Sequence, residues 1–248
     1  MRVGVFDSGI GGLTVVKSIL EHNLFEEVIY YGDTARVPYG SKDKNTIIRY
    51  SLEALEFFKN FDIDVLIVAC NTASAYALDE LRANTTIPVV GVIEAGILSL
   101  ENKLSNNDSN ILILGTKATI SSKKYEVALK SYGFNNLTSI ATGLFVPIVE
   151  EQLENTQILD KTFEHYFKDL SHIDAVILGC THFPLIEEKI GKYLGNAMTI
   201  HSGEAIVELL KLKYNCNNKF TKTDIKFFAS ENPDGLKDVA KKWLGELI

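Results

Sequence analysis

The sequence predicts an α/β fold of two similar, doubly wound domains with the functional site in the cleft between them. Short apolar runs alternate with longer amphipathic stretches along the chain, which is typical of strands and helices that follow one another. The apolar runs are continuous, as in parallel strands that are covered on both faces. Two landmarks also recur at nearly the same spacing, so matching positions are expected to face each other across a cleft.

The expected elements follow in order along the chain. Residues 46–59 carry Ile47, Tyr50, Leu55 and Phe58 near helical spacing, which predicts an amphipathic helix. Strands are expected at the continuous apolar runs, which cover residues 3–6, 28–31, 65–69, 89–93, 111–114 and 175–178.

The chain repeats a strand that runs into a cysteine and a polar turn. Residues 64–72 resemble residues 174–182, which places Cys70 opposite Cys180 at an offset of 110 residues. A second pair, a strand that runs into a turn, fits an offset of 109 residues between 3–7 and 111–116. Two landmarks at almost one offset predict two similar halves.

The repeat also predicts the domain organisation. The first α/β domain is expected over residues 1–93 plus 207–248, with the C-terminal segment returning to complete it. The second is expected over residues 94–206. No proline- or glycine-rich linker marks either boundary.

The composition excludes several classes of protein. The 248 residues are 46% hydrophobic and 23% charged, which argues against disorder. The net charge is −7 and Lys and Arg are scattered, so no nucleic-acid partner is expected. No run is apolar enough to span a membrane and residues 1–7 do not resemble a signal peptide, so a cytoplasmic protein is expected. The three cysteines lie too far apart for a zinc or redox CxxC pattern, which predicts free thiols and no metal site.

Polar clusters follow four of the predicted strands. Ligands of open parallel sheets bind just beyond the carboxyl ends of the strands, so these clusters are the expected site. The clusters are Asp7-Ser8-Gly9, Gly32-Asp33, Cys70-Asn71-Thr72 and Cys180-Thr181-His182.

The two cysteines predict a specific class of chemistry. A thiol near a helix N-terminus has its pKa lowered, which makes it a better base or nucleophile. Inversion of a carbon acid needs a base on one face of the carbon and an acid on the other, and Cys70 and Cys180 at matching positions suit that task. Asp7 is expected to assist Cys70, and His182 to assist Cys180. The alternatives are buried structural cysteines, a turn aspartate and a core histidine.

Two further segments bear on the ligand. Residues 7–12 are glycine-rich, and Asp33 follows at the spacing expected for the acidic residue of a dinucleotide-binding fingerprint. However, Thr14 occupies the position where that fingerprint needs its third glycine. A turn whose N–H groups bind a carboxylate is the better interpretation. Residues 31–40 form a turn-rich loop, either a plain surface loop or a flap whose Tyr39 and Gly40 backbone groups meet the ligand.

Four motifs together give the chain a specific resemblance. Residues 4–12, 31–40, 69–74 and 178–185 resemble the glutamate racemases of the aspartate/glutamate racemase superfamily, and the likeness runs from Gly4 to about Ala205. The resemblance implies two α/β domains, often in a homodimer, that interconvert L- and D-glutamate without a cofactor and so supply D-glutamate for peptidoglycan. The chain departs from the family pattern at His201, where an acidic residue is expected.

The resemblance also implies roles for individual residues. Cys70 would deprotonate D-glutamate and Cys180 L-glutamate, with Asp7 and His182 assisting and Glu150 as a further helper. Thr116 and Thr119 are additional candidates for the site. The substrate would be bound by Asp7, Ser8, Tyr39, Gly40, Asn71, Thr72, Thr181 and His182.

Three other functions stay open at this point. A racemase of aspartate or of a hydantoin would use the same two thiols on a substrate of another length. A cysteine hydrolase built on Cys180 and His182 would leave Cys70 without a role. A binding protein for an acidic amino acid would need neither thiol.

Overall fold

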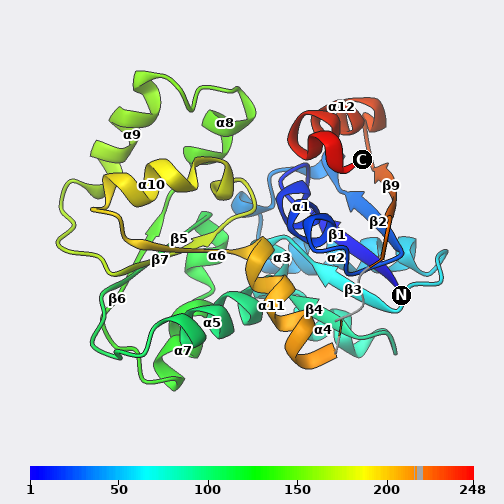
Figure 1. The fold of residues 1–248 in the computed structure, drawn as a ribbon, viewed down its shortest axis with the longest axis horizontal. Helices are drawn as coiled ribbons and strands as arrows, with labels where there is room; N and C mark the ends of the chain where they lie inside the picture. The colour runs from blue at the N-terminus through cyan, green and yellow to red at the C-terminus, as the bar shows by residue number, and fades with distance from the viewer. Residues whose placement is uncertain (215, 217–219) are drawn as a thin grey trace.

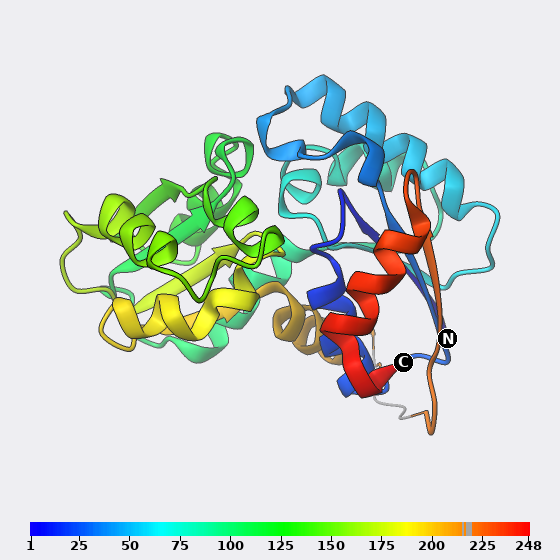
Figure 2. The same ribbon diagram turned by 90° about the horizontal axis from the view of Figure 1, so that it is seen from above.

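The computed structural model describes residues 1–214, 216 and 220–248. Its strands form two parallel sheets that lie in separate lobes, as Figures 1 and 2 show from two directions. Both chain ends lie in the same lobe, which we call the first lobe. Within the described ranges, no helix is both long enough and apolar enough to cross a membrane.

The sheet of the first lobe has the strand order β4-β3-β1-β2-β9. Alternate residues of β1 face opposite sides: Val3 and Val5 contact a core shared with α1, α11 and α12, whereas Phe6 contacts a core shared with α2, α3 and α4. The strands are β1 (Arg2–Asp7), β2 (Glu27–Gly32), β3 (Val65–Val68), β4 (Val89–Gly91) and β9 (Asp224–Ala229). The helices are α1 (Leu13–Glu21), α2 (Lys44–Phe58), α3 (Asn71–Tyr76), α4 (Leu78–Ala83), α5 (Val92–Lys103), α11 (Ser202–Tyr214) and α12 (Pro233–Leu244).

The sheet of the second lobe has the strand order β6-β5-β7-β8. Leu112 and Leu114 of β5 face a core with α8, α9 and α10, while Ile111 and Ile113 face a core with α5 and α7. The strands are β5 (Ile111–Gly115), β6 (Leu137–Ala141), β7 (Ala175–Gly179) and β8 (Met198–His201). The helices are α6 (Lys117–Ser121), α7 (Lys124–Ser131), α8 (Phe145–Glu150), α9 (Gln157–Phe167) and α10 (Glu187–Tyr193). Short 3₁₀ turns cover Thr34–Arg36, Tyr39–Ser41, Phe183–Ile186 and Gly245–Leu247.

The two sheets have the same internal order, which confirms the predicted fold class. We match β1, β2, β3 and β4 to β5, β6, β7 and β8. The first sheet then has the order fourth, third, first, second, and the second sheet has the same order when it is read from β8. Strand β9 is an addition to the first sheet. The repeated cysteines therefore follow equivalent strands, β3 and β7. The predicted strand over 89–93 is too long, because β4 ends at Gly91 and Val92 already begins α5.

The lobes meet along α5 and α11, which pack against each other. Ala95 of α5 belongs to a core of the first lobe, whereas Ile97 of the same helix belongs to a core of the second. Both expected domain boundaries fall inside these two helices. The division of the chain at residues 93 and 206 stays a prediction, and the position of β9 beside β2 supports the return of the C-terminal segment.

Candidate active site

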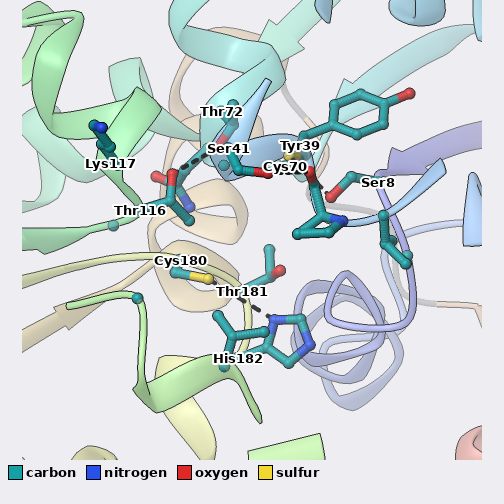
Figure 3. Close-up of a pocket in the computed structure, with 18 of the residues that line it drawn as sticks. Ser8, Tyr39, Ser41, Cys70, Thr72, Thr116, Lys117, Cys180, Thr181 and His182 are labelled. Carbon is teal, nitrogen blue, oxygen red and sulfur yellow. Dashed lines mark hydrogen bonds between the residues drawn. The ribbon is translucent and has the colours of Figure 1, made fainter. Parts of the chain in front are cut away.

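A cavity of about 440 Å³ lies where the central strands of both sheets end. It is lined by residues that follow β1, β3, β5 and β7 within one or two positions, so each lobe contributes two strand ends. Figure 3 shows Cys70 beside Ser8 and Tyr39, and Cys180 beside Thr181 and His182. The lining residues are Ser8, Gly9, Val37, Pro38, Tyr39, Gly40, Ser41, Cys70, Asn71, Thr72, Thr116, Lys117, Gly143, Val146, Pro147, Glu150, Gly179, Cys180, Thr181 and His182.

Cys70 lies two residues beyond the end of β3 and caps the short helix α3. Its Sγ lies 3.3 Å from Ser8 Oγ and accepts a hydrogen bond from the Ala73 amide at 3.5 Å. Burial and the neighbouring charge of Asp7 raise the pKa of this thiol to about 12, although the bonds with Ser8 and Ala73 oppose the shift. The expectation that the helix N-terminus lowers the pKa of this thiol is therefore wrong for Cys70, because desolvation outweighs the helix.

Cys180 and His182 form a pair in the other wall of the cavity. Sγ of Cys180 lies 3.8 Å from Nδ1 of His182, and Nε2 of the same ring lies 2.9 Å from a Glu150 carboxylate oxygen. Burial of His182 lowers its pKa, because it disfavours the charged imidazolium. The hydrogen bonds to Cys180 and Glu150 outweigh this effect and raise the pKa of His182 to about 10. Trp243 of α12 meets the same ring edge-on, with ring centroids 6.4 Å apart. The imidazole is thus held on three sides.

Asp7 lies behind the cavity wall and is not part of its lining. Its carboxylate accepts hydrogen bonds from the Gly9 amide at 2.9 Å and from Thr181 Oγ1 at 3.4 Å. Burial raises the pKa of Asp7, while the positive charge of His182 and these hydrogen bonds oppose the shift. Asp7 therefore ties the turn after β1 to the turn after β7 across the two lobes.

Gly11 allows these two turns to approach each other. A Cβ atom at this position would lie 2.7 Å from the His182 ring and would also overlap Thr181. Cβ atoms do not come this close to other heavy atoms, so a larger residue must displace the side chains of Thr181 and His182 or the turn that carries them.

The loop that carries Tyr39 and Gly40 covers the cavity from the first lobe. The Tyr39 hydroxyl donates to Asp33 Oδ2 at 2.5 Å, and Asp33 also accepts from Arg36 Nε at 2.8 Å and from Ser230 Oγ at 2.8 Å. Asp33 is fully buried. The phenol of Tyr39 is therefore hydrogen-bonded to Asp33 beneath the loop. The predicted polar cluster at Asp33 anchors the loop and does not line the cavity.

Threonine hydroxyls and an amide complete the polar lining. Oγ1 of Thr72 in α3 lies 2.9 Å from Oγ1 of Thr116 and 3.1 Å from Oγ1 of Thr119. The Oγ1 atoms of Thr116 and Thr119 are 3.0 Å apart. Nδ2 of Asn71 donates to Ser202 Oγ at 3.2 Å. These contacts join α3 to α6 and α11, so the hydroxyls meet where the lobes meet.

The structure brings together most of the residues that the sequence predicts for the site. Asp7 and Thr119 lie behind the wall, and the others line the cavity: Ser8, Tyr39, Gly40, Cys70, Asn71, Thr72, Thr116, Glu150, Cys180, Thr181 and His182. His201 is not among the lining residues, so the departure from the family pattern lies outside the cavity.

Several lining residues were missed in the sequence analysis. Ser41 directly follows the predicted loop, so extending the loop by one residue finds it. Lys117 directly follows the candidate Thr116. Val146 and Pro147 belong to α8, which is an apolar segment. The sequence of such a segment does not show which of its residues line a cavity and which belong to the core.

The chemistry available to this cavity is proton transfer from two sides. Each thiol has its own polar partners: Ser8 and the nearby Asp7 for Cys70, and His182 for Cys180. In the described part of the chain, no three His, Cys, Asp or Glu side chains are grouped so that they could hold a metal ion.

Comparison with known proteins agrees with this arrangement. The family model described as Asp/Glu/Hydantoin racemase matches residues 11–210. A glutamate racemase of Nitratiruptor sp. is 60% identical over 98% of this chain and 96% of its own length. The crystal structure of glutamate racemase from Campylobacter jejuni superposes with a TM-score of 0.98, at 53% identity and full coverage of both chains. The glutamate racemase of Francisella tularensis, solved in complex with D-glutamate, has a TM-score of 0.86 at 34% identity, covering 98% of this chain and 93% of its own. The chain belongs to the Asp/Glu/Hydantoin racemase family and, within it, to the glutamate racemases.

Proposed function

We propose that this protein interconverts L- and D-glutamate without a cofactor, by proton transfer between Cα of the substrate and two thiols. The observation that carries the proposal is that Cys70 and Cys180 line one cavity from equivalent strand ends of two sheets. Relatives that share the full length of the chain and are named glutamate racemases support the choice of substrate.

The reaction needs one thiolate and one thiol at a time. The thiolate takes the Cα proton, the electron pair of the C–H bond is delocalised into the carboxylate, and the other thiol donates its proton to the opposite face. The product leaves the two sulfurs with their protonation exchanged. In the free protein the high pKa of Cys70 keeps the proton on that thiol. Cys180 instead lies 3.8 Å from Nδ1 of His182, whose raised pKa of about 10 keeps the ring positively charged at neutral pH. The family resemblance implies that Cys180 deprotonates L-glutamate and Cys70 D-glutamate, and we propose the same assignment here.

The reverse direction requires a thiolate on Cys70. We assign Asp7 to this step, because its burial raises its pKa and so makes the carboxylate a better base for the proton of Cys70. His182 and its partner Glu150 would act correspondingly for Cys180.

The substrate would be held by neutral donors. Ser8, Thr72 and Thr181 offer hydroxyls, Asn71 offers its amide, and the loop offers the backbone of Tyr39 and Gly40. Thr116 and Thr119 would set the position of Thr72 by hydrogen bonds. Hydrogen bonds from such donors to a carboxylate are strong because the acceptor is charged.

The proposal is tested by solvent isotope incorporation in deuterium oxide. Purified protein is incubated with D-glutamate or L-glutamate without added cofactor, and both enantiomers are analysed by mass spectrometry at low conversion. We expect deuterium at Cα of the product but not of the remaining substrate, because separate thiols take and give the proton. Cys70→Ser and Cys180→Ser should each lower racemisation by at least about 10³-fold. Cys216→Ser is the matched control, since Cys216 is buried in the first lobe and does not line the cavity.

The other outcomes identify the rival functions. A wild-type protein that leaves glutamate unchanged contradicts the proposal, and activity with aspartate would then indicate a racemase of the shorter acid. A Cys70→Ser variant with full activity would favour a hydrolase built on Cys180 and His182. Equal deuterium in substrate and product would favour a single base that exchanges its proton with water.

The setting of the reaction is part of the proposal. A supply of D-glutamate for peptidoglycan places the enzyme in the cytoplasm, and the free state of Cys70, Cys180 and Cys216 supports a reducing compartment. We also propose a homodimer, as the family resemblance implies. Light scattering coupled to gel filtration should then give twice the mass of the 27.6 kDa chain.

A further inference from the structure

Tyr125 is a buried tyrosine of the second lobe that contacts a cavity residue of the first. It lies in α7 and its side chain is 4% exposed. Its hydroxyl donates a hydrogen bond of 2.7 Å to Oδ1 of Asn71, the first residue of α3. A side chain from one lobe is thus bonded to a cavity residue of the other.

The ring of Tyr125 is enclosed by two glycines. A Cβ atom on Gly96 of α5 would lie 3.5 Å from the ring, and one on Gly179 would lie 3.3 Å from it. Gly179 directly precedes Cys180, and α7 packs beside α5, as Figure 1 also shows. The ring therefore has a fixed place between α5 and the end of β7, and its hydroxyl has a fixed direction.

The hydrogen bond determines which way the Asn71 amide points. Asn71 has two buried neighbours, the Tyr125 hydroxyl on one side and Ser202 Oγ on the other. With Oδ1 facing Tyr125, the phenol proton has an acceptor and Nδ2 donates to Ser202. With the amide reversed, Nδ2 would face the phenol oxygen, and the phenol proton would lose its acceptor in a buried place, which is costly.

We infer that Tyr125 is a positioning residue that holds the Asn71 amide with Nδ2 toward the substrate carboxylate. Nδ2 has two N–H groups, one of which is used by Ser202, so the second remains as a donor for an anion. If the amide reversed, Oδ1 would face the anion and repel it. This inference rests on the proposed function, because it takes the anion to be a carboxylate of glutamate.

The inference is tested with Tyr125→Phe, which keeps the ring and removes only the hydroxyl. We expect KM for D- and L-glutamate to rise about 10-fold, because a donor to a charged group is misaligned, while kcat changes less than about 3-fold. Tyr132→Phe is the matched control, since Tyr132 ends the same helix and is 46% exposed. It should leave KM unchanged.

A double-mutant cycle separates positioning from a general structural effect. In an Asn71→Ala background, Tyr125→Phe should change KM less than about 2-fold, because its effect passes through the missing amide. Thermal melts show whether each variant is folded, and Asn71→Ser replaces Asn71→Ala if the latter is not.

Three results would overturn the inference. The first is a wild-type KM in Tyr125→Phe, and the second is the same rise of KM with and without the Asn71 amide. The third is an unchanged KM in the folded Asn71 variant. A failure of the proposed function is distinguishable, because wild-type protein would then not racemise glutamate at all.

Discussion

Nδ1 of His182 lies 3.8 Å from Sγ of Cys180, and the opposite nitrogen of the same ring lies 2.9 Å from Glu150. The imidazole therefore joins a carboxylate to one of the two thiols, while the other thiol has a buried aspartate as its charged neighbour. Because of this asymmetry, the step that uses Cys180 should respond to substitution of His182, and the step that uses Cys70 to substitution of Asp7.

Substitution of His182 should weaken the step that uses Cys180. We expect His182→Asn to lower kcat/KM about 100-fold, and equally in both directions, because enantiomers have the same free energy. The α-deuterium isotope effect on kcat/KM should rise with L-glutamate and fall toward unity with D-glutamate. Asp7→Asn is the matched counterpart and should give the opposite pattern. Equal isotope effects for both substrates in both variants would refute the assignment of the thiols.

The stability of the fold should depend on pH through His182. The pKa of His182 is raised from 6.5 to about 10 in the folded protein, so folding favours the bound proton. This contribution is full below about pH 6.5 and is lost as the pH rises toward 10. Urea unfolding should therefore show that His182→Asn costs more stability at pH 6 than at pH 9. The titration of Cys70 cancels in this difference, because both proteins contain that thiol. A cost that grows with pH would contradict the raised pKa.

A methyl group at Gly11 should separate the two turns that meet behind the cavity. We expect Gly11→Ala to lower kcat/KM by about 10²-fold, since displacement of a catalytic group by one ångström can cost that much. Gly191→Ala in α10 is the control, because a Cβ atom there would lie 3.4 Å from its nearest neighbour. Activity assays and circular dichroism of both variants check this prediction. Normal activity of Gly11→Ala would show that the turns can separate freely.

Removal of the Tyr39 hydroxyl should loosen the loop over the cavity. Tyr39→Phe leaves the buried Asp33 carboxylate without one of its donors, which should cost about 1–3 kcal/mol of unfolding free energy. KM should rise as well, because Tyr39 and Gly40 line the cavity. Urea unfolding and steady-state kinetics measure the two effects, with Tyr132→Phe as an exposed control. Unchanged stability would mean that Arg36 and Ser230 are sufficient partners for Asp33.

The strands that were predicted from the sequence are mainly the buried ones. β1, β3, β5 and β7 are buried at nearly every position, so each appears as a continuous apolar run. The missed strands β6, β8 and β9 all lie at sheet edges and are partly exposed, so their residues mix apolar and polar types. The strand signal depends on burial and weakens at the edges.

The site residues that could be predicted from the sequence are also those that depend on buried strands. Residues directly after buried strands, such as Cys70 and Cys180, could be predicted because parallel strands end together. Tyr125 and Trp243 could not, because each reaches the site from a helix distant in the sequence through tertiary packing. The raised pKa of Cys70 was also missed, since desolvation depends on the folded surroundings.

The pairing of β9 with β2 bears on how the protein is made. A ribosome makes β9 only after β2 and all four strands of the second sheet, whereas β5 to β8 follow one another closely. The second sheet can therefore assemble during translation, while the first keeps β2 as an open edge until β9 emerges. Unpaired edges invite pairing with other chains. Nascent or truncated chains that end before β9 thus carry the aggregation hazard of this fold in the first lobe.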